Sequence, residues 1–270
     1  MQLAATTFRG RDITIRLHGA GLHRYPRIRK LNPSFRRNVP LLKLQVTIDW
    51  SPPDPAHALA ELQERLAGVS PSFRRHQCRG QEGYRLFQGP THDGATQDSG
   101  GSLEASLALA HLIEHVMIDV ISFITSSHRV SGVTGAPWDS NRPLDLFVEC
   151  PDLSLASLSI HLAMTWLLAL LEGHSLNGCG RPTLELARHL YRNRFQSVVP
   201  RRAARELSQA PDKVLEALRF LEKAGFACQE RHTMNFSGTT YYHVCPGKAD
   251  PVPDAADGID PPGLKDPSIG

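Results

Sequence analysis

The chain has 270 residues, of which 41% are hydrophobic and 21% are charged, and its formal net charge is +3. These values describe an ordinary globular protein of one or two domains. The five cysteines are odd in number, widely spaced and free of any C-x-x-C pair, which argues against a disulfide framework and a cysteine zinc cluster. With no signal peptide in the first ten residues, we expect a cytoplasmic protein.

Charge is spread unevenly along the chain. Residues 1–48 hold ten Arg or Lys against a single acid, Asp12, and we predict a basic N-terminal extension over residues 1–38. Such an arm either binds an acidic polymer or nucleic acid, or is a solvated and partly disordered extension. At the other end, residues 247–270 are acidic and rich in proline, which predicts a disordered tail.

The first folded unit is predicted over residues 39–175 as a layered α/β domain. Apolar and polar residues alternate over 41–50, which predicts a strand, and helical spacing follows over 55–66. Residues 89–102 are small and polar and predict a loop.

An apolar run over residues 103–124 predicts a buried helix that contains His111-Leu-Ile-Glu114-His115. This is the inverted zinc-peptidase signature H-x-x-E-H. Residues four apart share a helix face, so His111 and His115 can hold one zinc ion while Glu114 reaches a metal-bound water as general base. Asp119 lies one turn further along and could orient His115 as a supporting carboxylate. Because charged and histidine residues interrupt the run, we expect no membrane span.

A strand over residues 144–150 and a helix over 155–172 complete this unit. In the strand, Asp145, Phe147 and Glu149 share one face, and Glu149 could point at the motif helix. Simpler interpretations stay open for each residue. The two histidines could be core or interface residues, Glu149 could end an edge strand, and Asp119 could be solvated.

The second unit is predicted over residues 181–246, after a linker over 173–182. Three helices are predicted over residues 183–195, 203–209 and 211–224, and Gly225 ends the third. Two strands joined by a turn follow, over residues 226–232 and 239–244. Three helices and a two-stranded wing is the winged-helix order. The segment ARELSQAPDKVLEALRFLEKAGF resembles the helix-turn-helix of winged-helix regulators.

Candidate nucleic-acid contacts in this unit are basic residues just before and within its second helix and in its third helix, namely Arg201, Arg202, Arg205 and Lys213. The third helix carries equal numbers of acids and bases, whereas phosphate contact favours a positive excess. Both DNA binding and a protein-contact or dimerisation role therefore remain open, as does the formation of homo-oligomers.

The segments LLKLQVTIDW, PSFRRHQC, GYRLFQ, AHLIEHVMIDVISF and LDLFVEC together resemble the N-terminal domain of cyanophycin synthetase over about residues 40–172. That resemblance implies a zinc-metallopeptidase-like centre that cuts cyanophycin, an Asp backbone bearing Arg side groups. It also implies His111, His115 and Glu149 as zinc ligands and Glu114 as general base. The segment after the motif helix matches the family only loosely, and no ATP-grasp or ligase domain follows, so we expect no synthetase activity.

The sequence thus predicts an α+β protein with a metal-site helix and a C-terminal winged helix. The first functional hypothesis is a zinc-dependent hydrolase of peptide or isopeptide bonds in a peptide or polyamide substrate. The alternative is a winged-helix DNA-binding regulator whose N-terminal domain is a metal-binding or inactive sensor.

Overall fold

A computed structural model of the chain describes residues 2–3, 5–25, 29, 32–70, 100–135, 143–176, 179–194, 196–232 and 239–245. Helices combine with antiparallel strands, which confirms the α+β class. The predicted tail at 247–270 and most of the predicted loop at 89–102 lie outside the described residues.

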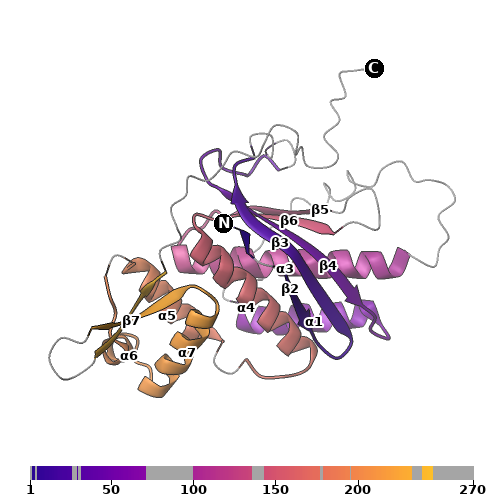
Figure 1. The fold of residues 1–270 in the computed structure, drawn as a ribbon. Coiled ribbons are helices and arrows are strands. Elements are labelled where there is room, and N and C mark those ends of the chain that lie inside the picture. The colour runs from indigo at the N-terminus through magenta and orange to yellow at the C-terminus, as the bar shows by residue number, and fades with distance from the viewer. Residues whose placement is uncertain are drawn as a thin grey trace.

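A six-stranded antiparallel sheet forms the centre of the N-terminal part (Figure 1). Its strands lie in the order β1-β3-β4-β6-β5, with β2 also paired to β3. Their bounds are β1 Gln2–Leu3, β2 Thr6–Arg9, β3 Ile13–His23, β4 Leu41–Trp50, β5 Gly132–Gly135 and β6 Leu144–Glu149.

The strand β3 overturns the prediction of a basic extension over residues 1–38. It pairs with β4 along ten residue pairs, and its side chains Ile13, Ile15 and Leu17 are buried in the core. The intervening Arg16 and His18 point to the other face and are exposed, and Arg16 forms an ion pair with Asp49 at 2.8 Å. The basic residues that suggested a free arm therefore include the outward positions of an ordinary two-faced strand.

The helices α1 Pro55–Val69, α3 Gly100–Thr125 and α4 Leu153–Leu171 pack against one another, and α3 packs against the sheet. Asp54 caps α1 by accepting a hydrogen bond from the His57 amide, and Asp152 caps α4 in the same way through Leu155. The motif helix α3 contacts β4, β5 and β6 directly, so its sheet-facing side chains are removed from water.

The C-terminal part contains α5 Arg181–Arg192, α6 Pro200–Glu206 and α7 Pro211–Lys223, followed by the hairpin of β7 Ala227–His232 and β8 Thr239–Val244 (Figure 1). Gly225 has φ +70° directly after the C-cap of α7, where a left-handed residue ends a helix most easily. A disulfide joins Cys228 to Cys245 across the base of the hairpin. The sequence argument against structural disulfides is wrong for this pair, because cysteines 17 residues apart become neighbours only when the hairpin closes.

One hydrophobic core runs through both parts. It includes residues of α3 and α4 together with residues of α5 and α7, such as Leu184 and Leu218. Two serines of α4 add polar ties, because Ser157 donates to the Ala224 carbonyl at 2.6 Å and Ser154 to the Cys245 carbonyl at 2.6 Å. The predicted linker therefore joins elements that share a core.

By length and composition alone, α3 and α4 could each cross a membrane. Most of each apolar window, 67% and 72% respectively, is buried inside the structure. Core helices of globular proteins have the same properties, so the two helices are weak evidence for a membrane.

Candidate metal centre

The motif side chains of α3 lie together against the sheet. The rings of His111 and His115 have centroids 4.3 Å apart and meet at 64°, as expected for residues one helical turn apart. Glu114 is 3% exposed and His115 is 9% exposed, whereas the side chain of His111 keeps 24% of its surface. The structure therefore brings the three motif residues into one small polar cluster at the edge of the core.

Glu114 is held by two partners on different elements. Its Oε2 atom lies 3.2 Å from His111 Nδ1 and accepts a hydrogen bond from Thr134 Oγ1 of β5 at 2.5 Å. A carboxylate can only accept, so the first contact requires the proton of His111 to be on Nδ1. The arrangement thus selects one tautomer of His111, the one whose Nε2 carries a lone pair.

Nε2 of His111 is the most informative atom of the cluster. It is buried and has no hydrogen-bond partner among the described residues. Buried polar atoms are nearly always paired, and an unpaired one needs an explanation. A neutral imidazole that donates from Nδ1 to a carboxylate and presents Nε2 is the usual form of a histidine metal ligand.

Glu149 does not join this cluster, which corrects its predicted role as third ligand. It pairs with Leu41 and lies on the sheet face of Phe147, whereas Leu144, Leu146 and Val148 form the face that packs on α3. All six residues of β6 are buried, so alternation in the sequence did not reveal which face meets the helix.

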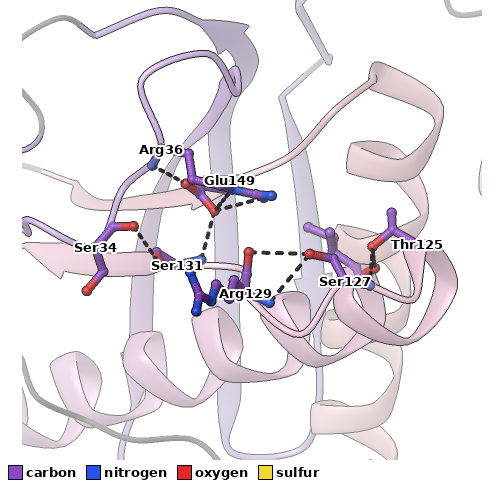
Figure 2. Close-up of polar contacts among 8 residues, drawn as sticks. Ser34, Arg36, Thr125, Ser127, Arg129, Ser131 and Glu149 are labelled. Carbon is purple, nitrogen blue, oxygen red and sulfur yellow. Dashed lines mark hydrogen bonds and ion pairs between the residues drawn. The ribbon is translucent and has the colours of Figure 1, made fainter.

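The partners of Glu149 are shown in Figure 2. Its carboxylate accepts from the Arg36 backbone amide at 2.5 Å, from Arg36 Nε at 3.0 Å and from the Ser131 amide at 3.2 Å, and Arg36 also forms an ion pair with it at 3.0 Å. Its neighbour Cys150 is fully buried, and burial raises the pKa of that thiol. Glu149 is therefore a buried, fully bonded carboxylate that ties two loops to the sheet.

Asp119 is buried as well, and its Oδ2 atom accepts a hydrogen bond from the Ser70 hydroxyl at the end of α1. This contact excludes the solvated interpretation of Asp119. The predicted support of His115 by Asp119 stays a prediction.

The described part of this cluster contains two candidate metal donors, His111 and His115. Within the described ranges, no group of three or more His, Cys, Asp or Glu side chains lies in a metal-holding arrangement. The donor chemistry fits zinc at His111 and His115, two of the three protein ligands that a catalytic zinc usually takes.

The candidate nucleic-acid contacts lie on exposed surfaces of α6 and α7. Arg201, Arg202 and Arg205 are all exposed on α6, where Arg202 pairs with Glu206 at 2.6 Å. Lys213 lies in the first turn of α7 and pairs with Glu216 at 3.1 Å. Hydrogen bonding to Glu206 raises the pKa of Arg202, and the same bond lowers the pKa of Glu206. Two of the four bases thus have an acidic neighbour on their own helix.

Sequence reasoning missed Thr134, Gly132 and Arg36, which complete the surroundings of Glu114 and Glu149. A Cβ built on Gly132 would overlap Glu114 Oε1 and lie 2.9 Å from Ile118 Cδ1, so a larger residue there would force the ends of these two side chains to shift. The alternation Gly132, Val133, Thr134 in a glycine-containing segment was the available signal, and four residues are too few to identify a strand.

Comparison with known proteins adds no identification, because no family model, curated protein or solved structure matches the chain significantly. The resemblance to the cyanophycin synthetase N-terminal domain therefore stays a prediction from the motifs.

Proposed function

We propose that this protein is a zinc-dependent hydrolase of amide bonds, with its centre at the H-x-x-E-H motif of α3. One observation carries the proposal most strongly. The buried Nε2 of His111 has no hydrogen-bond partner within the described ranges, and it belongs to an imidazole that lies beside His115 and whose Nδ1 faces Glu114. A packing histidine would be expected to satisfy both ring nitrogens when buried.

His111 and His115 would hold the metal. When bound, zinc supplies Lewis acidity, which makes a coordinated water a nucleophile near neutral pH and polarises the substrate carbonyl. We assign the proton transfer to Glu114. Its Oε2 is occupied by His111 and Thr134, and a carboxylate retains further acceptor capacity on its other oxygen.

The balance of the reaction follows from these roles. Glu114 accepts a proton from the attacking water, the water oxygen bonds to the amide carbon, and the carbon–nitrogen bond breaks. Glu114 then returns the proton to the leaving amine. The substrate class, a peptide or an aspartate-based polyamide, is proposed from the resemblance of the motifs to the cyanophycin-cleaving domain.

The first experiment is metal analysis by mass spectrometry of protein purified without chelator or affinity metal. We expect about one zinc per wild-type chain and a loss of zinc in His111→Ala. Absence of zinc from both proteins would remove the proposal. If the wild-type protein contains zinc, cyanophycin and a labelled casein serve as hydrolysis probes.

Glu114→Gln separates the ligand role from the proton-transfer role. The glutamine oxygen can still accept from His111 Nδ1 and Thr134, so zinc should remain bound. Loss of the base should lower the hydrolysis rate by about 10²- to 10⁴-fold. A Glu114→Gln protein with wild-type activity would contradict the mechanism.

A second candidate function is supported by the C-terminal part. The order α5, α6, α7 and an antiparallel hairpin suits a winged helix, and α6 exposes Arg201, Arg202 and Arg205. In this case the protein would be a DNA-binding regulator whose N-terminal domain senses a metal. Duplex binding that weakens with salt is the property that this candidate requires.

A further inference from the structure

The short strand β5 lies between two buried carboxylates of the N-terminal part, Glu114 and Glu149. Its residues alternate in direction, so Gly132 and Thr134 face Glu114 on α3, while Val133 faces the opposite side with Phe147. Within the part of the chain that the structure describes, β5 pairs with β6 and ends the sheet. An edge strand of four residues needs further support if it is to hold a buried carboxylate in place.

That support comes from Glu149 and the loop before β4. The Glu149 amide donates to the Ser131 carbonyl at 2.9 Å, and its carboxylate accepts from the Ser131 amide at 3.2 Å. Asn32 adds a hydrogen bond from Nδ2 to the Gly132 carbonyl at 3.1 Å. Ser131, just before β5, and Gly132, its first residue, are therefore both bonded to neighbouring segments, and Arg36 holds Glu149 from the loop (Figure 2).

We propose that Thr134 is a positioning residue for the Glu114–His111 pair, and that Glu149 supports Thr134 by holding β5 in place against α3. The Thr134 hydroxyl fixes the Glu114 carboxylate, and Glu114 in turn fixes the ring and tautomer of His111. This proposal rests on the proposed function only in its assumption that His111 Nε2 binds zinc. Supporting partners of this kind typically change metal affinity by about 10- to 100-fold when removed.

The test uses Thr134→Val, which keeps the branched shape of the side chain and removes the hydrogen-bond donor. Thr134→Ser restores the donor. Thr125→Val is the matched control, because Thr125 lies at the end of the same motif helix and donates at 2.7 Å to the Ile121 carbonyl of that helix. Circular dichroism and thermal midpoints establish that all three variants are folded.

Two measurements follow on the full-length chain. Nitrogen-15 NMR of the histidine rings in metal-free protein reports the tautomer of His111. Competition with a chromophoric chelator gives the Kd for zinc. We expect Thr134→Val to populate the Nε2-protonated tautomer and to raise the zinc Kd by about 10- to 100-fold. Thr134→Ser and Thr125→Val should behave as wild type in both measurements.

Glu149→Gln tests the second half of the proposal. It should shift both measurements in the same direction as Thr134→Val, and the double variant should be less than additive because both changes act through β5. A wild-type tautomer and a wild-type Kd in Thr134→Val would overturn the proposal. If wild-type protein binds no zinc, the proposed function fails, while the tautomer measurement still decides the role of Thr134.

Discussion

The helices α3 and α7 carry their polar groups in opposite ways. On α3, Glu114 and Asp119 are buried, and each is bonded to a different element, to β5 through Thr134 and to the end of α1 through Ser70. On α7 the charged residues lie on the outward face, and Lys213 pairs with Glu216 of the same helix. A buried carboxylate persists only if the surrounding structure satisfies it, whereas an exposed pair makes little demand on the fold.

This difference shows which side chains the fold holds in fixed positions. The cluster around α3 depends on contacts between segments that are distant in sequence, and a change in any one of them should disturb the others. The surface of α6 and α7 can change with little effect on stability. Chemistry that needs fixed positions is therefore expected at α3, and binding that needs only charge is expected at α6 and α7.

We expect the largest loss of stability when the Cys228–Cys245 disulfide is reduced. That loss would qualify the comparison of α3 with α7, because it would show that the C-terminal part also depends on a contact between separate segments. Closing a loop of this length stabilises a protein by about 3 kcal/mol. Denaturant unfolding with and without reductant measures the difference. Cys228→Ser should match the reduced wild type and should not respond to reductant. Equal stability of oxidised and reduced wild type would contradict the prediction.

A smaller loss of stability is expected from Gly132→Ala, which tests whether the buried cluster around α3 tolerates a change in one of its contacts. The added methyl group would overlap Glu114 and crowd Ile118, and overpacking of this kind costs about 2 kcal/mol. Displacement of Glu114 should also weaken zinc binding. Denaturant unfolding and chelator competition measure the two effects.

Gly135→Ala is the control for this substitution on the same strand. The nearest atom to its added Cβ is the Asp145 carbonyl oxygen at 3.9 Å, an ordinary contact. We expect near wild-type stability and zinc affinity from Gly135→Ala. Equal losses in the two alanine variants would mean that β5 tolerates no side chain at all, and the specific contact with Glu114 would then not explain the result.

Sequence patterns predicted most elements closely because apolar spacing determines them. The strand over 41–50 agrees with β4, and the predicted helix over 211–224 agrees with α7 to within one residue. The motif residues were found because they lie on one continuous helix, where spacing alone decides which side chains meet.

The remaining features depend on contacts between distant segments. The orientation of Glu149 could not be predicted, because both faces of β6 are buried and its partner Arg36 lies 113 residues earlier in the chain. Likewise, β5 has only four residues, two of them glycine, and it becomes a strand because β6 pairs with it. Pairing overrides local preference in such segments.

The smallest effect on stability is expected from neutralising the surface of α6 through Arg201→Ala, Arg202→Ala and Arg205→Ala together. All three side chains are exposed, and the ion pair of Arg202 with Glu206 lies within the helix, so the thermal midpoint should not change measurably. Arg36→Ala is the contrasting variant, because it leaves the buried Glu149 without its cation and should lower the midpoint clearly.

The same triple variant tests whether the C-terminal part binds DNA or has a protein-contact role instead. Fluorescence anisotropy with a labelled DNA duplex at several salt concentrations measures the binding. A DNA-binding winged helix predicts affinity that falls with salt in wild type and a shallower dependence in the variant, by about one phosphate contact for each arginine removed. Binding that ignores both salt and the three arginines would contradict a DNA contact at α6. Because the variant keeps its fold, a loss of duplex binding would report the surface charge of α6, and zinc binding at α3 should be unchanged in the same protein.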